Sequence, residues 1–283
     1  MIPEISVILQ GPVVNDIYPP SGLPTTFYAI RKVRDLLPKS EIIVSTWEGQ
    51  DTALLEADIV ICSRDPGGQL SPVANGIINN VNRQIISTTS GLNVASSALA
   101  LKIRSDTILT GTNFIKVFQK SKPPKAEWAL FENRIISNNL SSRNPRAMPH
   151  MPLSFHPADH VHFGLLCDLK TLWDIPLQSD EDAEFFMRHP RPDRFRDCRE
   201  TSRLTPEQYI CTSAFSKKFP INMAHYVDPH VIDLSEKLLL NNFVFLADRE
   251  FPIHLMKYHN EHHSKFEWMR YPAKKPWWKI CGK

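Results

Sequence analysis

The sequence has few glycines and no glycine-rich motif. Only 10 of its 283 residues are Gly, against 23 Pro. Pro restricts the backbone whereas Gly frees it, so we expect stiff connections between the elements. The sequence contains no Walker motif, no G-x-G-x-x-G and no internal repeat. These absences exclude the common glycine-rich phosphate loops and the repeat architectures.

Cysteine and long apolar runs are also scarce. The five cysteines (62, 167, 198, 211 and 281) are widely spaced and form no C-x-x-C, which argues against a zinc knuckle and a disulfide framework. No apolar run approaches the roughly 18–20 residues that span a bilayer. Met1–Glu4 shows neither the basic nor the apolar region of a signal peptide. Together these features predict a protein of the reducing cytoplasm.

The charge balance is close to neutral. The formal net charge is +3, with 42% hydrophobic and 22% charged residues. This composition is typical of a globular chain, and the length suits one large domain. A charge this small speaks against bulk binding to nucleic acid, so no nucleic-acid partner is expected.

Four short apolar runs predict strands. The first three are expected to be buried on both faces, a pattern typical of a parallel sheet, whereas the fourth alternates with period two. The runs are Ile5–Leu9, Glu41–Ser45, Asp58–Cys62 and Leu99–Ile103. A polar loop follows each run, and ligands of open α/β sheets collect at the carboxyl ends of the strands. The sequence therefore predicts an α/β fold, a mixed sheet flanked by helices, with its ligand site at these loops.

Helices are expected between the runs. One spans about 25–37, and another covers Asn79–Ser87 and is closed by Gly91. The second helix carries a polar face with a spacing of i, i+3, i+4 and i+7, which we expect to point into the ligand site: Asn80, Arg83, Gln84 and Ser87.

The second half of the chain is more polar. Trp128–Phe131 predicts a strand, and residues 137–151 predict a long active-site loop. Asp159, His160 and His162 precede an apolar segment. The two histidines are either ligands or ordinary loop residues. Thr205 is an N-cap with Pro206 at the first helical position and Glu207 in the first turn.

Several phrases, in this order and spacing, resemble the WavE lipopolysaccharide-synthesis family. They are Ser6–Pro12, Glu41–Trp47, Asp65–Gly67, Asn79–Ile85, Ser87–Leu92, Lys102–Asp106 and Pro206–Tyr209. The resemblance implies a GT-A-like, Rossmann-type glycosyltransferase. It further implies a single domain with a nucleotide-sugar half to residue 110 and an acceptor half over 111–264. The implied reaction moves a sugar from a nucleotide-sugar donor to a lipopolysaccharide or capsule glycan.

The resemblance also implies a metal motif, which is incomplete in this chain. GT-A enzymes carry D-x-D, whereas this chain has Arg104-Ser105-Asp106. Asp106 is then the single predicted ligand of Mg²⁺ or Mn²⁺. Arg104 either faces a phosphate or neutralises Asp106, and with Lys102 it could supply part of the charge of the metal.

The candidate site residues divide by role. The predicted base for the acceptor hydroxyl is Asp159 or Glu207, and Glu207 could instead serve only the helix dipole. Late histidines (254, 259, 262 and 263) are either one more metal ligand or a solvated cluster. Trp47 either stacks on the donor or packs in the core. The residues predicted to bind the nucleotide sugar are Gln10, Gly11, Pro12, Trp47, Asp65, Asn82, Arg83, Lys102 and Arg104.

The basic aromatic tail, 265–283, alternates cations with aromatic residues. It predicts contact with an anionic membrane surface or a lipid-linked acceptor, or else a packed C-terminal segment.

The sequence leaves two other functions open. One is a non-catalytic carbohydrate- or nucleotide-binding subunit, and the other is a sugar nucleotidyltransferase, for which Gln10-Gly11-Pro12 is a poor triphosphate loop.

Overall fold

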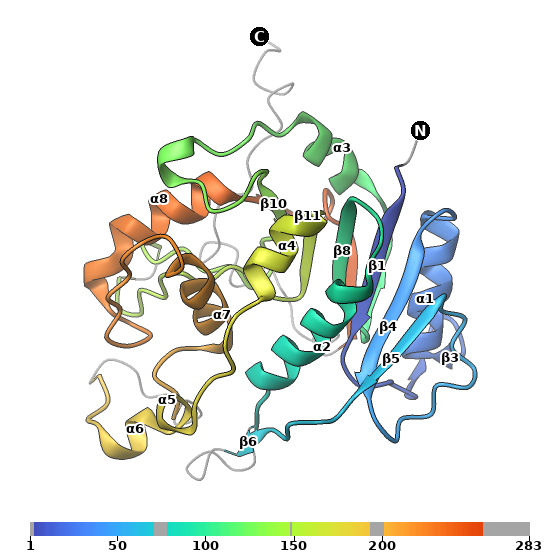
Figure 1. Ribbon diagram of the computed structural model, residues 1–283, viewed down its shortest axis with the longest axis horizontal. Coiled ribbons are helices and arrows are strands. Elements are labelled where there is room, and N and C mark those ends of the chain that lie inside the picture. The colour runs from blue at the N-terminus through green and yellow to red at the C-terminus, as the bar shows by residue number, and fades with distance from the viewer. Residues whose placement is uncertain (1–2, 71–77, 148, 193–200, 257–283) are drawn as a thin grey trace.

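The computed structural model describes residues 3–70, 78–147, 149–192 and 201–256. Its centre is a seven-stranded sheet with the strand order β12-β10-β11-β8-β1-β4-β5 (Figure 1). These strands are β1 (Ile5–Gln10), β4 (Glu41–Trp47), β5 (Ile59–Ser63), β8 (Leu99–Arg104), β10 (Ile135–Asn138), β11 (Val161–Leu165) and β12 (Phe243–Leu246). Three two-stranded ribbons lie outside this sheet: β2 (Ile17–Tyr18) with β3 (Leu23–Pro24), β6 (Gln69–Leu70) with β7 (Ile78–Asn79), and β9 (Thr107–Leu109) with β13 (Ile253–Leu255).

The four strands predicted from the apolar runs are confirmed as β1, β4, β5 and β8, and they are parallel. Strand β11 runs antiparallel to both β8 and β10, while β10 and β12 are parallel. The predicted mixed α/β sheet is therefore confirmed. In register, Gln10 at the end of β1 lies opposite Arg104 of β8 and Ser45 of β4. The residues that leave these strands thus meet at one edge of the sheet.

Helices cover both faces of the sheet (Figure 1). One hydrophobic cluster joins α1 (Thr25–Leu36) and α3 (Asn113–Lys120) to Val7 and Leu9. Another joins α2 (Val81–Val94), α4 (Leu166–Trp173), α7 (Pro206–Phe215) and α8 (Ile232–Asn242) to Ile8. Strand β1 is therefore covered on both faces, and all six of its residues are buried. The other helices are the short α5 (Asp180–Ala183) and α6 (Phe185–Arg188), together with the 3-10 turns η1 (Ala126–Trp128) and η2 (Pro229–Val231).

The sequence predicted that Gly91 closes α2, and this prediction is wrong. The helix continues to Val94, and Gly91 is buried at its contact with the sheet. A Cβ atom at Gly91 would lie 2.4 Å from Cγ2 of Ile8 and 3.3 Å from Cβ of Ser45. Gly91 therefore lets α2 approach β1 and β4 closely, which brings the polar face of the helix to the ligand edge.

Two predictions for the second half are wrong in detail. Trp128–Phe131 forms a 3-10 turn followed by irregular chain, because the amides of Leu130 and Phe131 donate to Oδ1 of Asn242 instead of to a strand. The predicted loop 137–151 begins inside β10, and none of its described residues lines the cavity at the carboxyl edge of the parallel strands.

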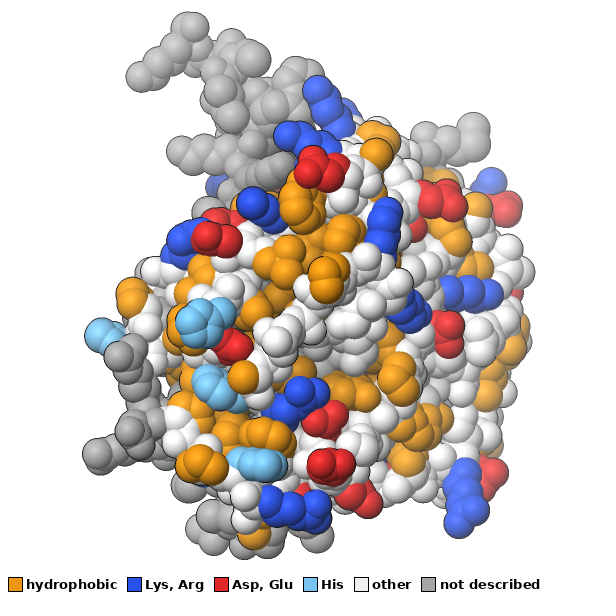
Figure 2. All heavy atoms as spheres, turned by 60° about the vertical axis from the view of Figure 1, so that its left-hand side comes forward, with side chains coloured by type: hydrophobic (Ala, Val, Ile, Leu, Met, Phe, Trp, Pro, Cys, Tyr) orange, Lys and Arg blue, Asp and Glu red, His pale blue; other side chains and the backbone are white. Residues whose placement is uncertain are grey.

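Some expectations concern membranes and thiols. Within the described ranges no helix is long and apolar enough to cross a membrane. Cys62, Cys167 and Cys211 are free thiols. The tail 265–283 and the late histidines 259, 262 and 263 lie outside the described residues. His254 belongs to β13, where its ring meets Tyr18 edge-on. On the face shown in Figure 2, acidic and basic side chains of the described residues are interspersed.

Candidate functional site

A cavity of about 570 Å³ opens at the carboxyl edge of the parallel strands. The loops that leave β1, β4, β5 and β8 form one side of it, together with the first turns of α2. The segment before β11 and the start of α7 form the other side. Its wall consists of Gln10, Gly11, Pro12, Val14, Trp47, Gln50, Asp65, Ile78, Asn80, Arg83, Gln84, Ser87, Arg104, Ser105, Asp106, Asp159, His160, Pro206 and Glu207.

The loops after β1 and β8 are fastened together. Gly11 has a φ of +119°, and a Cβ atom there would lie 3.0 Å from Oγ of Ser105. Its amide donates to the carbonyl oxygen of Ser45 at 3.0 Å, and the Ser105 hydroxyl donates to that of Pro12 at 2.7 Å. Glycine is favoured at this φ, so the position suits both the turn and the close approach.

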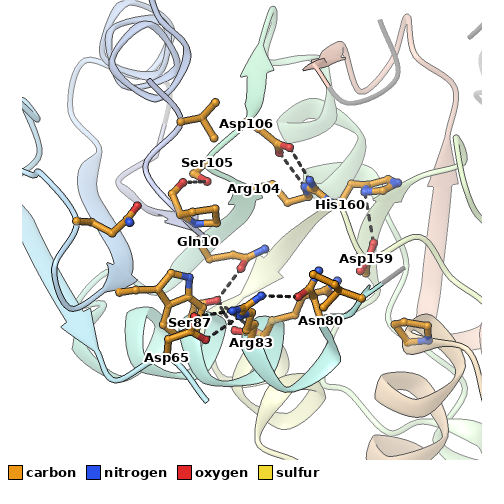
Figure 3. A pocket seen from close by; sticks show the side chains of 18 of the residues that line it. Gln10, Asp65, Asn80, Arg83, Ser87, Arg104, Ser105, Asp106, Asp159 and His160 are labelled. Atoms are coloured by element: carbon orange, nitrogen blue, oxygen red, sulfur yellow. Dashed lines mark hydrogen bonds and ion pairs between the residues drawn. The ribbon is translucent and has the colours of Figure 1, made fainter. Parts of the chain in front are cut away.

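The predicted polar face of α2 does point into the cavity, since all four of its side chains line the wall. Arg83 donates from Nε and Nη2 to the two carboxylate oxygens of Asp65 at 2.7 and 2.6 Å (Figure 3). Its Nη1 donates to Oδ1 of Asn80 at 2.9 Å, and the Ser87 hydroxyl donates to Oε1 of Gln10 at 2.7 Å. The hydrogen bonds from Arg83 lower the pKa of Asp65, so this carboxylate is ionised at neutral pH.

Arg104 and Asp106 form a second bidentate pair. Nε and Nη2 of Arg104 donate to Oδ1 and Oδ2 of Asp106 at 2.8 and 2.5 Å. Burial alone would raise the pKa of Asp106, but the hydrogen bond and charge of Arg104 hold it below its usual value. The structure thus supports neutralisation of Asp106 by Arg104, one of the two roles that the sequence left open.

Asp159 and His160 form the opposite wall. Oδ1 of Asp159 lies 3.4 Å from Nδ1 of His160, whose Nε2 is 3.0 Å from Oγ of Ser141. Burial alone would raise the pKa of Asp159, but His160, Lys102 and Arg104 outweigh burial and hold it well below its usual value. Burial lowers the pKa of His160 to about 4, so its imidazole is neutral at neutral pH.

Glu207 reaches the cavity from the first turn of α7. Thr205 and Gln208 form a capping box before it, which fixes the start of the helix as the sequence predicted. Oε2 of Glu207 lies 3.5 Å from Nε2 of His156. Burial lowers the pKa of His156 to about 3, so a neutral imidazole faces this carboxylate. The sequence did not identify His156, although it begins the histidine-rich segment.

Two of the predicted donor-binding residues do not line the cavity. Lys102 is fully buried behind Asp159. Its ammonium donates to the carbonyl oxygen of Asp159 and lies 4.6 Å from the centre of the Trp173 ring. Asn82 exchanges two hydrogen bonds with the backbone of Gln178, at 2.7 and 3.0 Å.

The other predicted site residues come together. Trp47 is only 6% exposed, yet it lines the cavity. Ser105 and Gln50 were not nominated from the sequence, because neither carries a pattern that distinguishes it from other polar loop residues. The predicted residues that share the wall are Gln10, Gly11, Pro12, Trp47, Asp65, Arg83, Arg104, Asp106, Asp159 and Glu207.

The donor atoms do not fit a divalent cation well. Mg²⁺ and Mn²⁺ require oxygen ligands, and Asp106 offers two that Arg104 already occupies. Among the described residues no group of three or more His, Cys, Asp or Glu side chains is arranged to hold a metal ion. The prediction of Mg²⁺ or Mn²⁺ at Asp106 therefore finds no prepared set of ligands in this part of the chain.

Comparison with known proteins gives one family. The family model described as WavE lipopolysaccharide synthesis matches residues 5–279. No curated protein matches the sequence.

Solved structures share parts of the architecture. HddC from Yersinia pseudotuberculosis is 11% identical, with 66% of this chain and 87% of that chain covered and a TM-score of 0.35. The mannosyltransferase PcManGT from Pyrobaculum calidifontis, in complex with GDP-Man and Mn²⁺, is 11% identical over 62% and 48%, with a TM-score of 0.36. A cytidylyltransferase from Leptospira borgpetersenii is 12% identical over 85% and 98%, with a TM-score of 0.34. Because all three TM-scores are below 0.5, the function is inferred from the family match and from the geometry of the cavity.

Proposed function

Because this chain belongs to the WavE lipopolysaccharide-synthesis family, we propose that it transfers a sugar from a nucleotide-sugar donor to a lipopolysaccharide or capsule glycan acceptor. One observation carries the proposal. Arg83 of α2 and Arg104 at the end of β8 lie in the wall of the same cavity as the carboxylates Asp159 and Glu207. The arginines suit a diphosphate, and the carboxylates suit an acceptor hydroxyl.

The nucleotide of the donor fits the side formed by β1, β4 and α2. Asp65, held by Arg83, offers carboxylate oxygens to the hydroxyls of a ribose. Gln10 and Asn80 offer amide groups, and Trp47 offers an aromatic face for a base. This arrangement supports the donor-binding roles predicted for Gln10, Trp47, Asp65 and Arg83, and it adds Asn80 to them.

The leaving diphosphate requires positive charge. Arg83 and Arg104 both line the cavity, and Asn80, the N-cap of α2, lines it too. The start of this 14-residue helix adds the positive end of its dipole. Such fixed donors stabilise a diphosphate as its bond to the sugar breaks.

The acceptor hydroxyl must lose its proton as it attacks the sugar. Asp159 and Glu207 are the carboxylates on the acceptor side, and either could accept that proton if configuration inverts. Because His160, Lys102 and Arg104 hold the pKa of Asp159 well below its usual value, its carboxylate is a weak base. Glu207 beside the neutral His156 is thus our assignment.

The β1 exit loop speaks against a nucleotidyltransferase. Such an enzyme would use amides of this loop to bind a triphosphate. Here the amide of Gly11 donates to Ser45, Pro12 has none, and the amides of Val13 and Val14 donate to Gln50 and Thr26. The loop therefore has no amide from residues 11–14 to offer, which supports the glycosyltransferase.

The test follows the products. Purified full-length chain is incubated with UDP-, GDP-, CMP- and dTDP-sugars plus lipooligosaccharide, and separately with nucleoside triphosphates plus sugar 1-phosphates. We expect nucleotide release from at least one nucleotide sugar, with Arg83→Ala impaired and Arg146→Ala, a paired arginine outside the cavity wall, unimpaired. Pyrophosphate release would indicate the nucleotidyltransferase. Nucleotide binding without turnover would favour the non-catalytic subunit.

The cytoplasmic location, at the inner face of the membrane, stays a prediction, and so does the contact of the tail 265–283 with that membrane.

A further inference from the structure

Every carboxylate in the wall of the cavity has a basic or imidazole partner. Asp65 is paired with Arg83, and Asp106 with Arg104, each through two hydrogen bonds. Asp159 lies beside His160, and Glu207 beside His156. A divalent cation would therefore have to displace an existing partner before it could bind to any of these carboxylates.

Arg104 lies where its charge is shared between two carboxylates. Figure 3 shows its guanidinium between Asp106 and the ring of His160. Its charge also acts on Asp159, the partner of that ring. The guanidinium thus places a fixed positive charge directly on Asp106, the residue at which the sequence predicted the metal ion.

The charges of this group cancel. Lys102 and Arg104 contribute two positive charges, and Asp106 and Asp159 contribute two negative charges, while the neighbouring His160 is neutral. A divalent cation at Asp106 would meet the repulsion of both Lys102 and Arg104. An incoming diphosphate would meet a group without net negative charge, with Arg83 and the start of α2 on its other side.

We propose that the guanidinium of Arg104 takes the place of the divalent cation, so that the diphosphate of the donor binds without a metal ion. The inference rests on the proposed function, because it specifies how the same donor site binds its ligand. The N–H groups of Arg104 donate hydrogen bonds to the phosphate oxygens, because a planar guanidinium group suits phosphate geometry. Asp106 then orients this guanidinium and balances its charge before the donor arrives.

The test is nucleotide binding with and without metal. Isothermal titration calorimetry measures the Kd of UDP, GDP, dTDP and CMP, the nucleotides of the four donor classes tested above, for the full chain, once in EDTA and once in Mn²⁺. We expect at least one nucleotide to bind with the same affinity under both conditions. Binding that requires Mn²⁺ would overturn the inference and leave the proposed function standing. If none of the four binds under either condition, both fail.

Variants separate the two roles of the pair. Arg104→Gln should weaken binding in EDTA by about 10- to 100-fold, as expected for loss of charged hydrogen bonds, and Arg104→Lys by less. Asp106→Asn should keep measurable binding in EDTA, because an amide oxygen can still accept from Arg104. Arg146→Gln, whose guanidinium also pairs with carboxylates but lies outside the cavity wall, is the matched control. Full binding by Arg104→Gln in EDTA would contradict the proposal, and circular dichroism checks that each variant is folded.

Discussion

Lys102 donates a hydrogen bond from its fully buried ammonium to the backbone carbonyl oxygen of Asp159. The same ammonium lies over the ring of Trp173. The hydrogen bond fixes the backbone of the segment that carries Asp159. Because a charge buried in the sheet must be desolvated, this arrangement lowers the stability of the folded chain. Burial lowers the pKa of Lys102 to about 8, against the attraction of Asp159 and Asp106 and with the repulsion of Arg104.

The burial of Lys102 predicts a pH dependence of stability. Between about pH 8 and the unfolded pKa of about 10.5, the unfolded chain keeps the proton that the folded chain has lost, so the free energy of unfolding rises with pH. Urea unfolding at pH 7, 8.5 and 10 measures this for the wild type and Lys102→Met. Between pH 7 and pH 10, we expect the free energy of unfolding of the wild type to rise relative to that of the variant by up to a few kcal/mol. A pH-independent difference between the two proteins would show that Lys102 titrates normally.

The second prediction separates the two carboxylates of the acceptor wall. Glu207→Gln should lower kcat by about 10²- to 10⁴-fold with little change in the KM of the donor, because it removes the base. Asp159→Asn should lose its charge beside Lys102 and Arg104 and therefore affect stability and donor binding as well. Steady-state kinetics and thermal melts give both quantities. If Asp159→Asn alone abolished kcat while Glu207→Gln remained active, the base would be Asp159.

The Asp65–Arg83 pair should matter for binding more than for folding. Both side chains are about one third exposed, and pairs of this kind contribute about 0–1 kcal/mol to stability. We expect Arg83→Gln to leave the melting temperature nearly unchanged and to raise the KM of the nucleotide sugar about 10-fold or more. Arg188→Gln, which removes an exposed pair with Glu184, is the matched control. A large loss of stability with unchanged KM would mean that the pair is structural.

Local patterns in the sequence predicted much of the fold and part of the site. The four strands, the polar face of α2 and the capped start of α7 all depend on neighbours in the chain, and the structure confirms them. The predicted burial on both faces is wrong for β5, because this strand lies at the edge of the sheet, where Val60 and Cys62 are exposed. The position of the site at the sheet edge is then a consequence of the topology, because the loops of parallel strands meet there.

The features that the sequence did not predict depend on contacts between distant segments. Lys102 alternates with apolar residues as a solvent-facing residue would, yet β11 and Trp173 cover it. Asn82 lies beside the cavity-facing residues, but Gln178, almost a hundred positions later, engages it. The pairing of Glu207 with His156 likewise joins α7 to a loop before β11.

Gly91 offers a test of how α2 is positioned. Gly91→Ala would place a methyl group 2.4 Å from Cγ2 of Ile8, which is fully buried and must shift. Overpacking costs about 1–3 kcal/mol, and better helix propensity returns about 1 kcal/mol. We expect a net loss in the free energy of unfolding and weaker nucleotide binding, whereas Asn93→Ala, at an exposed position of the same helix, should not destabilise. A stabilised Gly91→Ala would show that α2 has room to move.

The most direct test of the proposed transfer is the fate of the sugar. The full-length chain is incubated with a nucleotide sugar that it turns over and with lipooligosaccharide, and mass spectrometry follows the acceptor while chromatography follows the nucleotide. We predict that the acceptor gains one glycosyl residue for each nucleoside diphosphate (or, from a CMP-sugar, monophosphate) released, and that Glu207→Gln abolishes both. An acceptor of unchanged mass across the whole donor panel, with nucleotide still bound, would contradict the assignment as a glycosyltransferase.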